Sequence, residues 1–162
     1  WLFGQDQNGD GIRTYPYTTN MSLNPHTYGN LAKASVGVQT EVHYTGEIWC
    51  TMLWDMYWGY VDKYGFDEDL YNGTGGNNRA VQVVIDAMKL QPCGPGFVDA
   101  RDAILAADSI RYGGANKKII WDAFARRACT TSPTASPSRW PSGVVGWRGS
   151  RCRWRPMAGG SR

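Results

Sequence analysis

The stretch from about Thr45 to Tyr64 is mostly apolar or aromatic, and three of its polar residues stand four positions apart. Glu47, Thr51 and Asp55 therefore share one narrow stripe along a predicted helix. A helix with so narrow a polar stripe is mostly buried, which predicts that this helix is central to a core. The stripe could line a cleft, although such stripes are more often the solvated or hydrogen-bonded side of a helix.

Three further helices are predicted after this one, with short connections between them. Their ranges are about 79–90, 97–111 and 117–127. The separating segments are rich in Gly, Pro and Asn, a composition typical of turns. They are NGTGGNN (72–78), PCGPG (92–96) and YGGAN (112–116). Four helices joined in this way predict a mainly α fold, organised as a compact helical lobe.

The apolar residues of these helices indicate the faces that should pack together. We expect the four helices to bury their apolar faces mainly against one another. On the second helix the residues that share an apolar face are Val81, Val84, Ile85 and Met88. On the third they are Phe97, Ala100, Ile104 and Ala107. Asn77 or Asn78 could cap the start of the second helix, because Asn is a favoured capping residue.

Composition divides the chain into three parts. Residues 1–40 are rich in Gly, Asn, Thr and Tyr, which predicts a loop-rich, extended segment leading into the helical lobe at 41–127. Residues 128–162 contain six Arg but no Lys, no acidic residue and no Leu, Ile, Phe or Tyr. We interpret this last part as a basic low-complexity tail that is disordered, or as a GC-rich message translated out of frame.

The formal net charge of +3 comes from the tail. Residues 1–127 contain 11 Lys and Arg against 14 Asp and Glu, so they are slightly acidic. The body of the protein therefore has no charge pattern that favours nucleic-acid binding. The sequence also contains no uninterrupted apolar run of about 18 residues, so it predicts no membrane-spanning helix.

The four cysteines are widely separated, and none of them forms a CxxC or CxxxC pair. This spacing argues against a zinc ribbon or a redox motif. Cys50 lies in the apolar helix, where a cysteine usually packs as a small hydrophobic residue. Whether Cys50 pairs with Cys93 stays open from the sequence.

The segment DQNGDG (6–11) has the start of a calcium-binding loop, in which oxygens ligate from alternate positions. Position twelve of such a loop should be a bidentate Glu, and here it is Tyr17. No predicted helix leads into the segment either. A simple Asn-Gly turn is therefore favoured over a calcium-stabilised binding domain.

His43 stands just before the apolar helix, four places ahead of Glu47. The chain has only one other histidine, His26, and it has no HExxH motif. A catalytic zinc site needs three protein ligands, so these residues by themselves do not indicate a metal site. A histidine at this position could serve a catalytic centre or be structural, and the residues alone leave both roles open.

Longer motifs around these residues occur in order between about Gly11 and Arg127. They are GIRTYPYTTNMSLNPHTYGNL (11–31), VH-x-x-GE-x-W (42–49), VID-x-MKLQPC (84–93) and F-V-x-ARDAI-x-x-AD (97–108). Together they resemble the C-terminal part of the fungalysin-type zinc metalloendopeptidases, a family similar in plan to thermolysin. The resemblance implies that the helical lobe forms one wall of a catalytic cleft.

The same resemblance implies roles for individual residues. His43 matches the family's VH histidine, which implies that it stabilises the oxyanion of the tetrahedral intermediate. Arg13 is implied to grip a carbonyl of the substrate or intermediate, and Glu41 to orient the His43 ring.

The family's HExxH motif and third zinc ligand lie upstream of the segment that this chain resembles. We therefore expect this chain to bind no catalytic zinc and to be inactive alone, with zinc held in the full-length parent. The resemblance implies a secreted, extracellular endopeptidase that acts on peptides or proteins and is made with a prosegment. Residues 1–40 are then expected to pack against the missing N-terminal catalytic lobe. The alternative is a non-catalytic helical interaction module that keeps the packing of the lobe.

Overall fold

The computed structural model describes residues 13–33 and 42–129. These ranges contain one 3-10 helix, η2 (Tyr28–Lys33), and four α-helices, with no strand among them. The α-helices are α1 (Val42–Tyr64), α2 (Gly76–Leu90), α3 (Phe97–Tyr112) and α4 (Lys117–Arg126). The mainly α fold is therefore confirmed, and each predicted helix is present. None of the described helices is long and apolar enough to cross a membrane.

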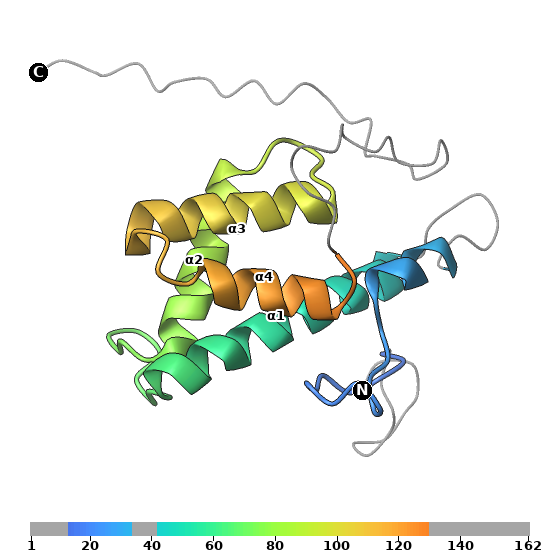
Figure 1. The fold of residues 1–162 in the computed structure, drawn as a ribbon, viewed down its shortest axis with the longest axis horizontal. Helices are drawn as coiled ribbons and strands as arrows, with labels where there is room; N and C mark the ends of the chain where they lie inside the picture. Colours follow the sequence, from blue (N-terminus) through green and yellow to red (C-terminus); the bar gives the residue numbers. More distant parts are fainter. Residues whose placement is uncertain (1–12, 34–41, 130–162) are drawn as a thin grey trace, which may run out of the picture.

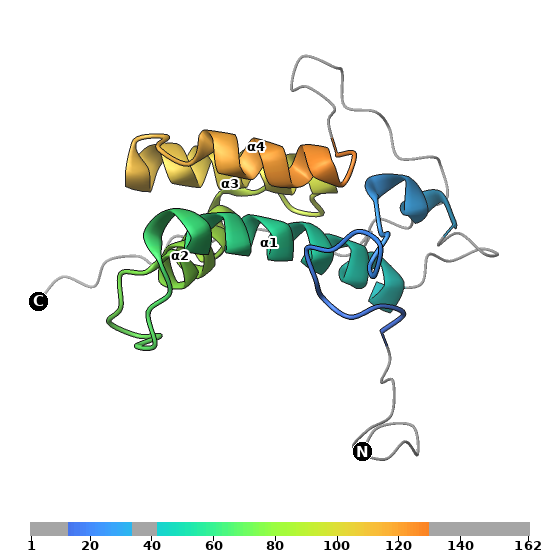
Figure 2. The ribbon, with the colours of Figure 1, turned by 60° about the horizontal axis from the view of Figure 1, so that its bottom comes forward.

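The longest helix, α1, runs along the lower side of the molecule in the view of Figure 1. Helix α4 runs alongside α1 in the opposite direction, and α2 crosses between α1 and α3. In the turned view, α3 and α4 lie together on one side of α1 (Figure 2). The helix η2 packs against the start of α1.

The core is built around one apolar stripe of α1. Its residues stand four apart and are fully or almost fully buried, as expected for one helical face. They are Ile48, Met52, Met56 and Tyr60. The other helices contribute buried residues to the same cluster, among them Val83, Ile104, Ile120 and Phe124. The prediction that this helix is central to the core is confirmed.

Glycines end two of the helices. Gly65 follows α1 with a φ of 77°, and Gly113 follows α3 with a φ of 63°. Only glycine adopts this left-handed conformation without steric cost, so both positions stop the helix and reverse the chain. The backbone N–H of Gly65 donates to the carbonyl of Val61 at 2.7 Å, which satisfies one of the last carbonyls of α1.

The predicted apolar face of α2 is wrong for three of its four residues, whereas Val84 is partly buried against the core. Val81, Ile85 and Met88 are 52%, 40% and 56% exposed, and the buried face contains smaller residues. That face is formed by Gly76, Asn77, Ala80, Val83 and Ala87. Because α2 crosses close to both α1 and α3, the side with small side chains is the one that fits between them. The predicted face of α3 is confirmed, since its four residues are buried.

Neither Asn77 nor Asn78 caps α2, because the residue before the helix is Gly75 and no side chain caps it. Asn77 instead holds the loop between α1 and α2. Its amide oxygen accepts the N–H of Asp67 at 3.0 Å, and its amide nitrogen donates to the Asp67 carbonyl at 2.7 Å. The Asn78 amide donates to the carbonyl of Asp69. The prediction that these residues lie at the start of the helix is confirmed, and the prediction that one of them caps it is wrong.

Candidate functional site

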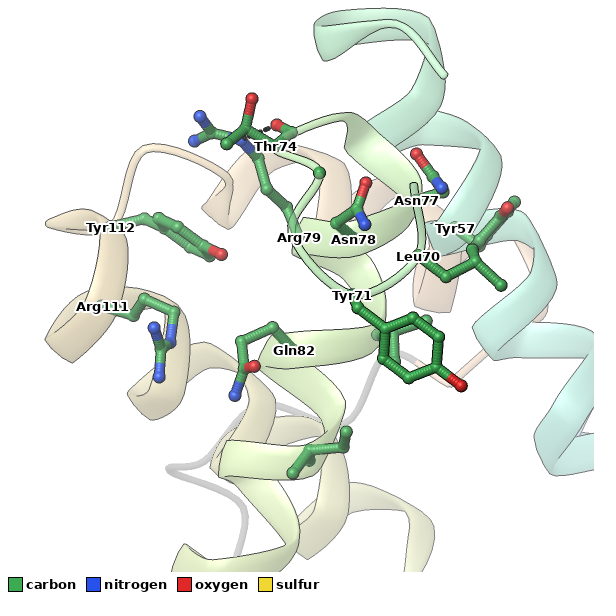
Figure 3. A pocket seen from close by; sticks show the side chains of 13 residues that line it. Tyr57, Leu70, Tyr71, Thr74, Asn77, Asn78, Arg79, Gln82, Arg111 and Tyr112 are labelled. Atoms are coloured by element: carbon green, nitrogen blue, oxygen red, sulfur yellow. Dashed lines mark hydrogen bonds between the residues drawn. The ribbon is translucent and has the colours of Figure 1, made fainter. Parts of the chain in front are cut away.

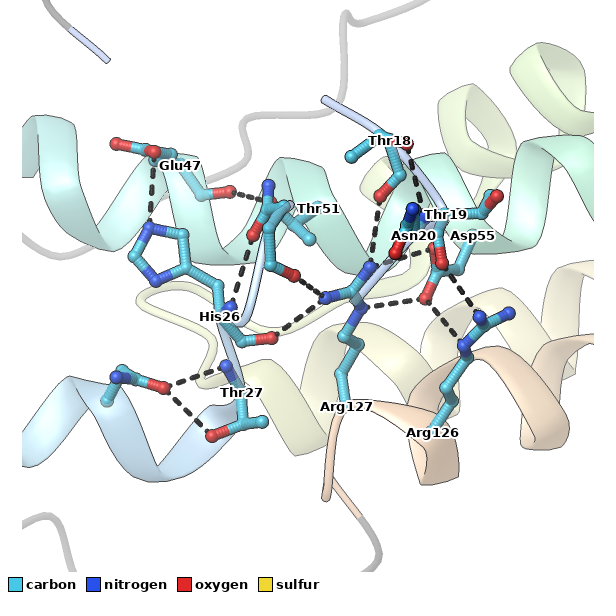
Figure 4. A network of polar contacts seen from close by, with 12 residues as sticks. Thr18, Thr19, Asn20, His26, Thr27, Glu47, Thr51, Asp55, Arg126 and Arg127 are labelled. Carbon is cyan, nitrogen blue, oxygen red and sulfur yellow. Dashed lines mark hydrogen bonds and ion pairs between the residues drawn. The ribbon is translucent and has the colours of Figure 1, made fainter. Parts of the chain in front are cut away.

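The polar stripe of α1 faces the segment from Arg13 to Thr27. Glu47, Thr51 and Asp55 are all buried (Figure 4). Glu47 and Thr51 hydrogen-bond directly to this segment, whereas Asp55 bonds to Arg127, whose guanidinium donates to carbonyls of the segment. The hydrogen-bonded interpretation of the stripe is therefore the one that the structure bears out. The stripe holds an irregular segment against a helix. The buried backbone N–H and carbonyl groups of such a segment need hydrogen-bond partners from elsewhere in the protein.

Glu47 anchors the start of the described segment. Its Oε2 accepts the backbone N–H of Thr14 at 2.9 Å, and its Oε1 accepts that of Tyr15 at 2.8 Å. The Nε2 of His26 lies 3.1 Å from the same Oε1. The side chains of Glu47 and His26 are each only 1% exposed. Burial of a carboxyl group is tolerated when several N–H groups donate hydrogen bonds to it.

The ring of His26 is held between two tyrosines. The rings of Tyr15 and Tyr44 meet it edge-on, with centroids 4.8 and 5.0 Å away. Because Nε2 faces a carboxylate, the proton of the neutral ring belongs on Nε2. The buried Nδ1 has no hydrogen-bond partner, so a proton there would add an unsatisfied buried donor.

Thr51 and Asn24 continue the contact one turn further along α1. The Asn24 amide donates to the Thr51 hydroxyl at 3.2 Å and to the carbonyl of Pro16 at 2.9 Å. Its amide oxygen accepts the backbone N–H of His26 at 3.1 Å. The Thr51 hydroxyl donates to the carbonyl of Glu47, which is the usual pattern for a threonine inside a helix.

Asp55 pairs with an arginine that follows α4. Arg127 is fully buried, and its Nε and Nη2 donate to the two carboxylate oxygens of Asp55 at 2.7 and 3.2 Å. The same guanidinium donates to the carbonyls of Thr18, Asn24 and His26. One side chain thus connects α1, the end of α4 and the 13–27 segment.

Two of the predicted site residues meet at the start of α1. His43 lies in the first turn, where its side chain is exposed. Arg13 reaches it from the neighbouring segment, and its Nη1 donates to the His43 backbone carbonyl at 2.9 Å. A guanidinium has five N–H donors, so this bond uses one of them. The residues are 30 positions apart in sequence, and the fold places them side by side.

Three sequence predictions lie outside the described residues. They are Glu41, expected to orient the His43 ring, the calcium-like segment at 6–11, and the basic low-complexity tail from residue 130 onward. Within the ranges that the structure does describe, no group of three or more His, Cys, Asp or Glu side chains is placed to hold a metal ion.

The cysteines do not cross-link the described part of the lobe. Cys50 is exposed, so the prediction that it packs in the core is wrong, and it is not joined to Cys93. Cys129 is buried, and burial raises the pKa of its thiol.

A pocket of about 560 Å³ lies away from these residues, where the α1–α2 loop meets α2 and α3 (Figure 3). Tyr57 is the residue of α1 that lines this pocket. It lies 14 positions after His43, or about 21 Å along the helix axis. Another groove of about 350 Å³ begins near the start of α1, at Val42, Gly46 and Trp49. Neither Arg13 nor His43 lines either space.

The family model of the fungalysin metallopeptidases (M36) matches residues 1–132. This chain belongs to the fungalysin family. The family resemblance expected from the motifs is therefore confirmed.

Relatives of this fungalysin-family chain are fungal extracellular metalloproteinases. Extracellular metalloproteinase 10 of Coccidioides posadasii is 45% identical over 130 residues, which cover 76% of this chain and 20% of the relative. Extracellular metalloproteinase MEP of Neosartorya fischeri is 48% identical over 123 residues, which cover 72% and 19%. Extracellular metalloproteinase 4 of Arthroderma gypseum is 43% identical over 138 residues, which cover 80% and 21%. The chain spans about a fifth of the length of these relatives.

No local pattern in the sequence indicates the partners of Glu47 and Asp55. His26 and Arg127 stand in no motif that predicts these contacts. The one usable signal was the four-residue spacing of the α1 stripe, which indicates that its polar residues share a surface. What that surface contacts depends on segments distant in sequence.

Proposed function

We propose that this chain is part of an extracellular metalloendopeptidase and contributes His43 to the stabilisation of the transition state of peptide-bond hydrolysis. Family membership and the names of the relatives support the reaction class and the location. The single observation that carries the role of His43 is its exposed position in the first turn of α1, with Arg13 beside it.

His43 is suited to donate a hydrogen bond. When a nucleophile attacks a peptide carbonyl, the carbonyl oxygen becomes an oxyanion in the tetrahedral intermediate. An imidazole N–H aimed at that oxygen binds the intermediate more strongly than the substrate, because the charge exists only after attack. A donor of this kind typically lowers the barrier by about 3–4 kcal/mol.

Arg13 is proposed to hold a carbonyl of the substrate or intermediate. Its guanidinium is permanently charged and presents several donors in one plane, which suits carbonyl and oxyanion groups. The bond from Nη1 to the His43 carbonyl fixes one edge of that plane at the backbone of His43. The two side chains would then act on neighbouring parts of one substrate.

The described residues do not fit the metal that the family implies, because they hold no suitable group of ligands. We propose that zinc is bound by the part of the peptidase outside this chain, and that its substrates are peptides or proteins. On this proposal the chain by itself hydrolyses nothing, and its partner is the rest of the peptidase.

Replacing His43 with alanine in the complete peptidase tests the proposal. Loss of the imidazole should lower kcat by about 100-fold to 1,000-fold, with little change in the melting temperature. Val42→Ala is the matched control, because Val42 is the exposed neighbour of His43 in the same helical turn. It should leave kcat unchanged. Full turnover by His43→Ala would remove the proposed role of the imidazole.

A further inference from the structure

Glu47 lies one helical turn after His43 and holds the backbone next to Arg13. The distance from His43 to Glu47 is set by α1 itself, because residues four apart share a helical face. The carboxylate of Glu47 then fixes two consecutive N–H groups, those of Thr14 and Tyr15, at 2.9 and 2.8 Å. Arg13 is the residue immediately before them.

His26 supports this carboxylate from the other side. Its Nε2 lies 3.1 Å from Oε1, the oxygen that also accepts the Tyr15 N–H. The ring is itself held by Tyr15 and Tyr44, and Tyr44 is the neighbour of His43 on α1. These contacts therefore join the His26 side chain, the backbone that follows Arg13 and the first two turns of α1.

We propose that Glu47 and His26 are positioning residues, which hold residues 14–15 so that the Arg13 guanidinium stays beside His43. Neither residue would touch the substrate, because both are buried. The inference rests on the proposed function, since it assigns a purpose to the contact between Arg13 and His43. A purely structural role would lower activity whether or not Arg13 is present. The positioning role predicts that Glu47 affects activity only when Arg13 is present.

The substitution Glu47→Gln tests this in the complete peptidase. It keeps the shape of the side chain but places an NH₂ group against one of the N–H donors that the carboxylate now accepts. Displacement of Arg13 by about 1 Å should then lower kcat/KM for a fluorogenic peptide by up to about 100-fold. Glu68→Gln is the matched control, because Glu68 is an exposed glutamate on the α1–α2 loop, and it should have no effect.

A double-mutant cycle with Arg13→Ala separates positioning from general destabilisation. If Glu47 acts through Arg13, Glu47→Gln should cause no further loss of kcat/KM in the Arg13→Ala background. Losses that multiply would overturn the inference. A His43→Ala variant with full turnover would instead overturn the proposed function, so the two failures are distinguishable.

A pair of His26 variants covers the case in which Glu47→Gln does not fold. His26→Gln retains an N–H donor for the carboxylate, whereas His26→Leu removes it. We expect His26→Leu to lower kcat/KM by about tenfold and only when Arg13 is present, with His26→Gln restoring most of the activity. Equal activity of the two variants, or an equal loss without Arg13, would contradict the positioning role.

Discussion

At the scale of single residues, the fully buried Arg127 forms an ion pair with the buried Asp55. A buried ion pair gives up the hydration of both charges, and it is tolerated only when the remaining donors and acceptors are satisfied. Arg127 meets this condition through Asp55 and three backbone carbonyls. Its own carbonyl accepts the N–H of Tyr28 at 2.8 Å, which also secures the start of η2.

Replacing Arg127 with methionine should therefore lower the free energy of unfolding by about 3–5 kcal/mol. The methionine fills part of the volume but leaves the Asp55 carboxylate buried without its bidentate partner. Urea denaturation of the chain measures the effect. Arg126→Met is the matched control, because Arg126 is 49% exposed and its Nε lies 3.9 Å from Asp55. The control should cost no more than about 1 kcal/mol, and equal losses would refute the assignment.

At the scale of elements, α1 buries two different stripes. Its apolar stripe packs in the core formed with the other helices, and its polar stripe binds the 13–27 segment through Glu47 and Thr51 and Arg127 through Asp55. The segment thus packs on the lobe's own helix, although we expected residues 1–40 to pack against another lobe. The physical reason is that buried Glu47 and Asp55 need donors, and this segment and Arg127 supply them.

The crossing of α1 and α2 depends on Gly76. A Cβ at this position would stand 2.1 Å from the carbonyl oxygen of Tyr60, which is backbone of α1 and cannot rotate away. Gly76→Ala should therefore destabilise the protein by roughly 1–3 kcal/mol, although alanine is the better helix former. The midpoint of urea denaturation checks this.

Gly46→Ala is the opposite case within α1. A Cβ there meets nothing within 4 Å, so only the gain in helix propensity remains. This variant should stabilise the protein by up to about 1 kcal/mol. A Gly76→Ala variant as stable as Gly46→Ala would show that the helices do not cross as closely as described.

At the scale of the whole molecule, the described residues form a helical lobe with no metal-binding group of their own. The chain spans about a fifth of the length of the three relatives described above, each of which is named an extracellular metalloproteinase. On the proposed function, the lobe supplies hydrogen-bond donors to a reaction whose metal is held elsewhere. His43 and Arg13 would then be one side of a site that another part completes.

The isolated chain should consequently show no casein hydrolysis after zinc is added. The complete peptidase, assayed under the same conditions, is the positive control. A chelator should abolish the activity of the control and change nothing for the isolated chain. Chelator-sensitive hydrolysis by the isolated chain would mean that its own residues bind a catalytic metal.

The positions of the helices could be predicted from the sequence because they depend on local rules. A period of about 3.6 residues, turn glycines such as Gly65 and Gly113, and the PCGPG stop act over a few positions. The same spacing placed Glu47, Thr51 and Asp55 on one stripe. The motif around His43 indicated the family, and with it His43 and Arg13 as separate candidate residues.

The buried face of α2 and the partners of the polar stripe were decided only by the tertiary structure. Val81, Ile85 and Met88 form an apolar face by spacing alone, yet a close crossing selects the smaller side chains of the opposite face. Asp55 and Arg127 are 72 positions apart, so their pairing depends on how α1 and α4 pack. Periodicity specifies which side chains share a surface, whereas burial and pairing require a second surface that only the folded chain provides.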